Sequence, residues 1–147
     1  MSQPSLFGGP GAGSAIAHID GGSRGNPGPA GYGVHITRSD GTLVELKGQV
    51  GVATNNVAEY RGLIAALTWA VGDGIGRLQV RSDSLLLVKQ MLGDYRVKHP
   101  GLRPLWEEAR RLARQIGEVR FEHVPRELNT DADRLANEAM DEAAARP

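Results

Sequence analysis

Residues 15–50 read AIAHIDGGSRGNPGPAGYGVHITRSDGTLVELKGQV, and this stretch decides the fold. Residues 15–20 form a short, apolar-rich segment that ends in a carboxylate, and residues 32–38 and 43–50 are two further extended runs. Residues 39–41, Ser-Asp-Gly, join the last two runs, because an Asp-Gly pair supplies the positive φ angles of a tight hairpin. Three consecutive strands joined by turns predict an antiparallel meander.

After this meander the apolar residues recur every three or four positions, which predicts a helix capped by Asn56 and ended by Gly72 and Gly74. Strand and helix patterns then alternate: a strand over 78–83, a helix over 84–91, a helix over 104–116, a strand over 119–123, and a last helix capped by Thr130. This order predicts an α/β fold. We expect a five-stranded mixed sheet, with strands 1-2-3 as an antiparallel meander and strands 4 and 5 parallel, flanked by about four helices.

The length of 147 residues favours one domain, which we place at residues 14–147, after a Gly-, Pro- and Ser-rich tail at residues 1–13 that we expect to be disordered. The absence of cysteine excludes disulfides, thiolate zinc sites and a cysteine nucleophile. Residues 1–13 do not read as a signal peptide, and no apolar run approaches the roughly 20 residues of a membrane span. We therefore expect a cytoplasmic protein with no membrane partner.

The charge balance is even, with 17 Lys and Arg against 17 Asp and Glu, so a polyanion would have to be recognised locally rather than by bulk charge. The glycine-rich segment 21–31 runs from one strand into another and lacks a Gly-Lys-Ser/Thr sequence, so it is not a phosphate-binding P-loop. It is either a turn whose glycines permit close backbone approach or a plain hairpin loop.

Four carboxylates fall at the predicted ends of strands and helices: Asp20, Glu59, Asp83 and Asp133. Three of them have a structural alternative, because Glu59 and Asp133 could complete capping boxes with Asn56 and Thr130, and Asp83 could cap a helix itself. Gathered together, however, like charges repel unless a cation lies between them. Hard oxygen ligands favour Mg²⁺ or Mn²⁺, and two such ions roughly 4 Å apart can drive phosphodiester cleavage.

The histidines predict less. His18 and His35 lie inside strands and are expected to pack or to lie at the surface, and His123 shares the apolar alternation of its strand, which favours a structural role. His99 lies in a loop beside Arg96 and Lys98, where it could contact a phosphate.

Four motifs occur in order: Ile19–Ser23 with Asn26–Gly33, Thr54–Glu59, Ser82–Ser84, and Asn129–Ala136. In these motifs and their spacing the chain resembles ribonuclease H type 1 over residues 15–141. The resemblance implies an endonuclease that hydrolyses the RNA strand of an RNA–DNA hybrid, leaving 5′-phosphate and 3′-hydroxyl ends. It also implies two Mg²⁺ or Mn²⁺ ions held by the four carboxylates.

The same resemblance assigns substrate-binding residues. Asn55 and Asn56 match asparagines that read the minor groove of the hybrid, and Asn26 lies in a loop that approaches the RNA strand. Thr54 matches a contact to a DNA-strand phosphate, but Val52 stands where an arginine often supports that contact, so we expect a weaker phosphate pocket.

The chain departs from many family members in two places. Residues 93–103 replace a longer basic protrusion, so the chain resembles the compact members. Many members also carry a histidine before the last helix that is thought to aid product release. Counting back from Asp133 reaches His123, whereas aligning the strand leaves residues 125–128 without a histidine and favours Arg126 for this auxiliary role.

Two other classes of function remain possible on the sequence alone: a nucleic-acid-binding module that does not cleave, and a structural domain whose carboxylates cap helices. The RNA–DNA hybrid is the expected partner, no protein partner is implied, and we expect a monomer.

Overall fold

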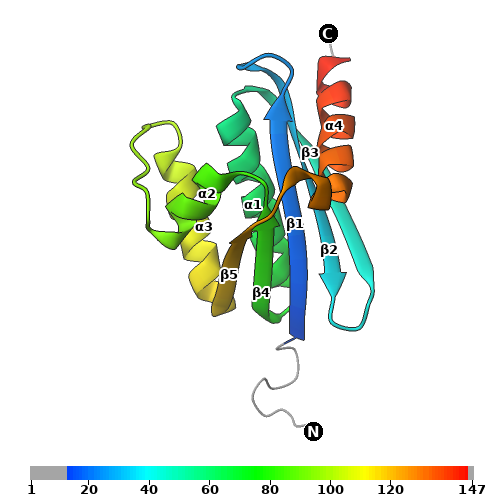
Figure 1. Cartoon of the computed structure of the whole chain (residues 1–147), viewed down its shortest axis with the longest axis vertical. Coiled ribbons are helices and arrows are strands. Elements are labelled where there is room, and N and C mark those ends of the chain that lie inside the picture. Colours follow the sequence, from blue (N-terminus) through cyan, green and yellow to red (C-terminus); the bar gives the residue numbers. More distant parts are fainter. Residues whose placement is uncertain (1–12, 146–147) are drawn as a thin grey trace, which may run out of the picture.

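The computed structural model describes residues 13–145 and contains one five-stranded sheet in the order β3-β2-β1-β4-β5 (Figure 1). The strands are β1 (Gly13–Ser23), β2 (Gly28–Arg38), β3 (Leu43–Ala53), β4 (Ile75–Ser82) and β5 (Glu118–His123). β1, β2 and β3 form antiparallel pairs, whereas β4 is parallel to β1 and β5 is parallel to β4. The predicted mixed sheet is confirmed. The predicted tail falls on residues 1–12, which lie outside the described residues, and on Gly13, which begins β1.

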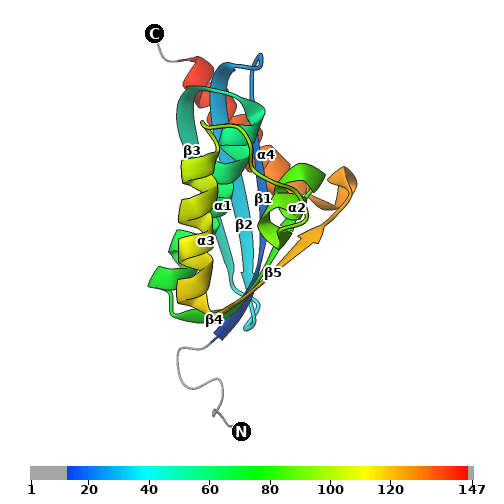
Figure 2. The ribbon, with the colours of Figure 1, turned by 90° about the vertical axis from the view of Figure 1, so that its left-hand side faces the viewer.

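Helices cover the two faces of the sheet unequally (Figures 1 and 2). The helices are α1 (Asn55–Gly72), α2 (Leu85–Leu92), α3 (Arg103–Ile116) and α4 (Thr130–Ala144), and a short 3₁₀ turn, η1 (Arg126–Leu128), precedes α4. α1, α2 and α3 lie on one face, and α4 alone packs on the other, against β2 and its neighbours. Among residues 13–145, none of the helices is long and apolar enough to cross a membrane.

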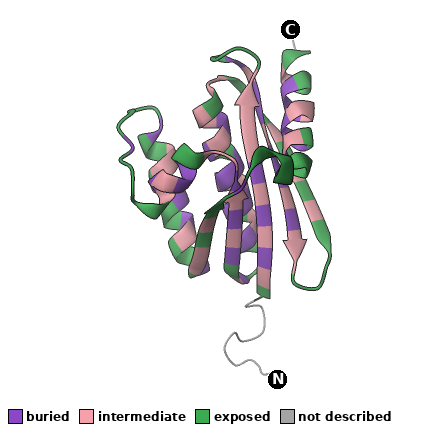
Figure 3. Ribbon diagram, in the orientation of Figure 1, coloured by how far each residue is buried: buried purple, intermediate pink, exposed green. Residues whose placement is uncertain are grey.

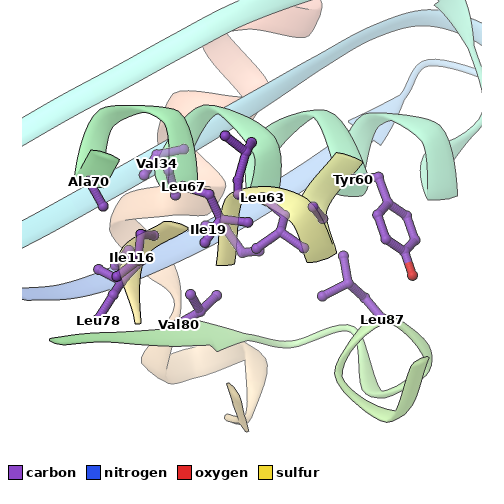
Figure 4. Close-up of a cluster of buried hydrophobic side chains, with 14 of the residues drawn as sticks. Ile19, Val34, Tyr60, Leu63, Leu67, Ala70, Leu78, Val80, Leu87 and Ile116 are labelled. Carbon is purple, nitrogen blue, oxygen red and sulfur yellow. The ribbon is translucent and has the colours of Figure 1, made fainter. Parts of the chain in front are cut away.

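The core lies between the sheet and the three-helix layer. Burial alternates in the first part of β1, where Ala15, Ala17 and Ile19 are buried and the residues between them are not, as the banding of Figure 3 shows. Figure 4 shows Ile19, Leu78 and Val80 of the sheet close to Leu63 and Leu67 of α1, and all five are essentially inaccessible to solvent. Burial of this apolar surface is the main stabilising contribution to the fold.

The first strand is longer than predicted. It continues three residues past Asp20 and stays paired with β2 as far as Ser23 and Ala30, so only residues 24–27 form the connection. A Cβ atom at Gly21 would lie 2.4 Å from the backbone carbon of Ala58, which shows how closely β1 approaches α1 there. Gly21 and Gly22, which were predicted to lie in a loop, are therefore part of β1, and at Gly21 the backbone of α1 packs directly against the strand.

The predicted cap of α1 is wrong. Thr54, not Asn56, is the N-cap, and its Oγ1 accepts a hydrogen bond from the Val57 amide at 3.3 Å. Asn56 lies within the first turn of the helix. Without a cap at Asn56, Glu59 is not at the position of a capping box, and its side chain is free for another role.

The two other capping alternatives are also wrong. Ser84 caps α2 through a 3.3 Å hydrogen bond from the Leu87 amide, so Asp83 does not. Asn129, not Thr130, occupies the N-cap position of α4, and no side-chain capping hydrogen bond forms there. These local alternatives lose because contacts with other elements decide where each helix begins.

α4 lies directly on the backbone of β2. A Cβ atom at Gly33 would lie 2.4 Å from the Ala132 carbonyl oxygen and 2.5 Å from the Leu135 Cβ. Contacts this short leave no room for a side chain, so Gly33 sets the distance between α4 and the sheet.

We expect Gly33→Ala to lower the free energy of unfolding by about 1–3 kcal/mol, because the new methyl group pushes α4 away from β2. Urea denaturation measures the change. Gly72→Ala is the matched control: a Cβ atom there meets nothing within 4 Å, so we expect no loss of stability. Equal stabilities of the two variants would contradict this account of the packing.

Candidate active site

The four predicted carboxylates come from four different elements and line one pocket of about 440 Å³. Asp20 lies in β1, Glu59 in α1, Asp83 directly after β4, and Asp133 in the first turn of α4. Because β1 and β4 are neighbours in the sheet, the C-terminal parts of both strands open onto this pocket. The same pocket is lined by Asn55, Asn137, Arg24 and Arg126, among others.

Hydrogen bonds from neighbouring residues orient this group. Glu59 Oε1 accepts a hydrogen bond of 3.2 Å from the Ser84 hydroxyl, which links α1 to the start of α2. The buried Asn129 donates from Nδ2 to the Ile19 carbonyl at 2.9 Å, next to Asp20. The Asn129 carbonyl in turn accepts from the Asp133 amide at 3.0 Å. Asn129 therefore ties the N-terminus of α4, and with it Asp133, to β1.

The pocket disfavours negative charge as long as no cation is bound. Burial, the charge of Asp83 and a hydrogen bond with Asp133 raise the pKa of Asp20 to about 8. Burial raises the pKa of Glu59 to about 7, although the Ser84 hydroxyl opposes the shift. Burial also raises the pKa of Asp83, against the nearby Arg126 guanidinium, which lowers it. Carboxylates with these properties gain most from a bound cation.

The chemistry of this donor set fits hard divalent cations. All four side chains offer carboxylate oxygens, which Mg²⁺ and Mn²⁺ prefer. Within residues 13–145, however, no three of these carboxylates bring ligand oxygens all within 4.8 Å of one another. A spread arrangement of this kind is compatible with ions shared between pairs of ligands rather than with one compact cage.

A second group of possible ligands lies elsewhere, and the sequence patterns do not single it out. His35 of β2, Glu45 of β3 and Asp131 of α4 have ligand atoms within 4.8 Å of one another. The Arg134 guanidinium is 2.6 Å from Glu45 and 3.9 Å from Asp131, so a cationic side chain already neutralises this group. We interpret it as an ion-pair network between α4 and the sheet.

Two of the predicted substrate-binding asparagines are interlocked. Asn26 Oδ1 accepts a hydrogen bond from the Asn55 amide at 3.0 Å, and Asn55 Oδ1 accepts one from the Ser23 amide at 2.9 Å. Both side-chain oxygens therefore act within the protein. Each Nδ2 group remains as a donor with no protein acceptor among residues 13–145.

The other predicted substrate contacts lie on the same end of α1. Thr54 uses its hydroxyl oxygen as a helix cap, and its hydroxyl hydrogen is still able to donate. Asn56 is half-buried in the first turn. Val52, which stands in place of an arginine, is 77% exposed and brings no charge to this region.

Arg126 lies in the turn before α4, and His123 lies three residues earlier, at the end of β5. Arg126 is in η1, with its Nη2 atom 3.7 Å from Asp133 Oδ1, and its side chain is 80% exposed. The segment predicted as a loop is thus a turn of 3₁₀ helix. His123 is the last residue of β5, as the strand alignment predicts, but it is exposed rather than packed, so its predicted structural role is wrong.

Four residues that the sequence patterns did not assign to the site orient its carboxylates or line the pocket: Ser84, Asn129, Asn137 and Arg24. Ser84 and Asn129 carry the signal of N-cap residues, and Asn137 lies one helical turn after Asp133. Those local signals give a position in a helix, but they do not reveal which distant carboxylate or strand is contacted.

Known proteins resemble this chain over the region that contains the pocket. The profile of a family described as reverse transcriptase-like matches residues 18–139. RNase H1 from Halobacterium salinarum, whose crystal structure is known, has 44% sequence identity to this chain. The two structures superpose with a TM-score of 0.84, over 88% of this chain and 99% of that chain. The chain belongs to the ribonuclease HI family.

Two further relatives of this ribonuclease HI chain are informative. The bifunctional protein Rv2228c of Mycobacterium tuberculosis is 54% identical over 131 aligned residues. The aligned region covers 88% of this chain but only 36% of that relative. The structure of the N-terminal RNase H domain of the same relative has a TM-score of 0.86, at 53% identity, over 90% of this chain and 96% of that one. LC11-RNase H1, solved in complex with an RNA/DNA hybrid, is 42% identical with a TM-score of 0.83, over 89% and 99% of the two chains.

The raised pKa values predict how stability depends on pH without divalent ions. Because folding raises the pKa values of Asp20 and Glu59, the folded state holds more protons than the unfolded state from about pH 4 to about pH 8. Stability should therefore fall as the pH rises through this window. In EDTA we expect a melting temperature roughly 2–5 °C lower at pH 8.5 than at pH 6.5.

The variant Asp20→Asn tests the cause, because it removes the group with the larger shift. We expect a smaller fall in melting temperature for this variant and a higher melting temperature than the parent at pH 8.5. Burial lowers the pKa of His18, so this residue makes stability depend on pH only below about pH 6.5. It does not affect the comparison of melting temperatures between about pH 6.5 and about pH 8.5. Parallel curves for parent and variant would show that Asp20 does not carry the effect.

Proposed function

We propose that this chain is an endonuclease that hydrolyses the RNA strand of RNA–DNA hybrids and leaves 5′-phosphate and 3′-hydroxyl ends. The observation that carries the proposal is the convergence of Asp20, Glu59, Asp83 and Asp133 on one pocket beside Asn55. Membership of the ribonuclease HI family supports it, as does the similarity to LC11-RNase H1, whose structure contains an RNA/DNA hybrid.

In this proposal Asp20, Glu59, Asp83 and Asp133 would hold two divalent ions, Mg²⁺ or Mn²⁺, and the chemistry supplied there would be activation of a water and stabilisation of the leaving 3′-oxygen. The chain's own contribution is to fix the ligands. The Ser84 hydroxyl orients Glu59, and Asn129 holds Asp133 beside β1. Glu59 and Asp133 are thus positioned by the protein itself, which limits the reorganisation that binding requires.

Discrimination between RNA and DNA is assigned to the asparagine amides. Asn26 and Asn55 have their oxygens engaged within the protein and present Nδ2 donors, which suit the 2′-hydroxyl oxygens and base acceptors of a minor groove. Asn56 and Thr54 extend this surface along the N-terminus of α1, where Thr54 would meet a DNA-strand phosphate. The expected weakness of that phosphate pocket agrees with the uncharged Val52.

The remaining parts of the proposal concern partners and location. The hybrid is the partner that the site suits, and we propose that the chain acts as a monomer in the cytoplasm. Because this chain spans only about a third of the first curated relatives, these statements apply to the ribonuclease domain itself.

The decisive experiment compares cleavage of labelled RNA–DNA, RNA–RNA and DNA–DNA duplexes with Mg²⁺, with Mn²⁺ and in EDTA. We expect metal-dependent cleavage of the RNA strand of the hybrid. Asp20→Asn and Asp83→Asn should each reduce the rate by about a thousandfold or more, because each removes a charged ligand. Circular dichroism verifies that both variants fold.

Asp73→Asn is the matched control, since Asp73 lies at the C-terminal end of α1 and pairs with Arg38 outside the pocket. Full activity of either pocket variant would refute the assignment. Hybrid binding without cleavage, even in saturating Mn²⁺, would instead favour a binding module.

Arg126 is assigned the auxiliary role in product release. We expect Arg126→Ala to lower the steady-state rate several-fold but to leave the single-turnover rate nearly unchanged, because a release step affects only repeated turnover. His123→Ala is the comparison, since His123 is the alternative candidate. If His123→Ala shows this split between the two rates and Arg126→Ala does not, the roles are reversed.

A further inference from the structure

Arg24 lies in the four-residue connection between β1 and β2, two residues before Asn26, and reaches across to α4. Its Nη2 atom is 2.7 Å from Asp141 Oδ1 and donates to Asn137 Oδ1 at 3.1 Å, with a weaker contact to the Asn137 carbonyl at 3.4 Å. Its backbone amide donates to the Pro29 carbonyl at 2.8 Å, which closes the connection. One side chain thus joins this connection to residues of α4 more than 110 positions later in the chain.

We propose that Arg24 is a positioning residue that holds the β1–β2 connection against α4 and so sets Asn26, together with its hydrogen bond to Asn55, relative to Asp133. This inference rests on the proposed function, in which Asn26 and Asn55 contact the RNA strand and Asp133 is a metal ligand.

On one side, the connection is joined to α1. The Asn55 amide donates to Asn26 Oδ1 at 3.0 Å, and Ser23 donates to Asn55 Oδ1 from its amide at 2.9 Å and from its hydroxyl at 3.2 Å. These bonds fix Asn26 to Asn55, but they do not relate the pair to α4. Because Asn55 is held at the start of α1, a movement of the connection would displace Asn26 from the Asn55 amide.

On the other side, Arg24 binds the part of α4 that supports Asp133. Asn137, whose side-chain oxygen accepts from Arg24, donates from Nδ2 to the Asp133 carbonyl at 2.9 Å. A continuous path of hydrogen bonds therefore runs from Arg24 through Asn137 to the backbone of Asp133. This path links the connection that carries Asn26 directly to the helix that carries Asp133, in addition to the link that Asn129 makes between α4 and β1.

The exposure of the Arg24–Asp141 ion pair indicates that it positions the connection rather than stabilises the fold. The side chains of Arg24 and Asp141 are 44% and 69% exposed, and ion pairs as exposed as these contribute little to folding. A shift of the asparagines would instead weaken contacts made equally to bound substrate and transition state. Such a change raises KM and leaves kcat nearly constant.

The test uses the full chain with an RNA–DNA hybrid under steady-state conditions. We expect Arg24→Ala to raise KM about three- to tenfold, with kcat within about twofold of the parent and the melting temperature within about 2 °C. Arg24→Lys should recover part of the loss, because its ammonium can still pair with Asp141. Arg77→Ala is the control, since Arg77 is an exposed arginine paired with Glu118 away from the pocket, and it should change neither constant.

A second variant separates positioning from direct contact with the substrate. Asp141→Ala releases Arg24 without removing its charge, so a positioning role predicts a rise in KM in the same direction as Arg24→Ala. The double variant should then be no worse than the poorer single variant. If Asp141→Ala leaves KM unchanged or lowers it while Arg24→Ala raises it, Arg24 contacts the hybrid itself and the proposal is overturned.

Hydrogen exchange gives a readout that does not depend on catalysis. In both Arg24→Ala and Asp141→Ala we expect faster exchange of two backbone amides. The amide of residue 24 donates to the Pro29 carbonyl, and the Asn55 amide donates to Asn26 Oδ1, so both report on whether the connection is held in place. Unchanged exchange in both variants would overturn the proposal even if KM rose. If the parent chain does not cleave the hybrid, the proposed function fails, while the exchange data still decide whether Arg24 holds the connection.

Discussion

The close approach of β1 to α1 at Gly21 is the constraint on which the candidate site depends. No side chain fits between the strand and the Ala58–Glu59 backbone, so Asp20 and Glu59 are brought to the same pocket from elements almost 40 residues apart. α4 obeys the same rule on the other face, where Gly33 allows its first turn to lie on β2. Backbone contact on both faces, rather than side-chain packing, thus determines where three of the four carboxylates lie.

The electrostatic cost of the site follows from this geometry. The same burial that brings the carboxylates together raises the pKa values of Asp20 and Glu59, so the pocket favours protons or cations over free charge. The neighbouring groups reduce this rise in pKa but do not cancel it. The Ser84 hydroxyl lowers the pKa of Glu59, and the Arg126 guanidinium lowers that of Asp83, yet both values remain raised. A fold selected for stability alone would place apolar or neutral groups here, so the arrangement is intelligible as one built for a cation.

The sheet and its strand directions were predictable from the sequence because alternation, an Asp-Gly turn and a later change of period all point to the same architecture. The helix starts were not. Asn56, Asp83 and Thr130 are each good capping residues locally, but Thr54, Ser84 and Asn129 take those positions. The reason is tertiary: Ser84 also bonds Glu59 and Asn129 also bonds Ile19, and neither partner is near in sequence. The four carboxylates could be singled out, whereas the residues that orient them could not.

The even charge balance conceals a separation of charge within the fold. Between residues 13 and 145, five basic side chains have no carboxylate oxygen within 4.0 Å: Arg61, Arg96, Lys98, Arg110 and Arg114. Four of these five lie between residues 96 and 114, in α3 and the segment before it, while the acidic pocket lies at the ends of β1 and β4. A phosphate backbone would therefore meet local positive charge on one side of the molecule and carboxylates that need a cation on another. Because opposite charges cancel in the sum but not in space, a net charge of zero is compatible with a nucleic-acid substrate.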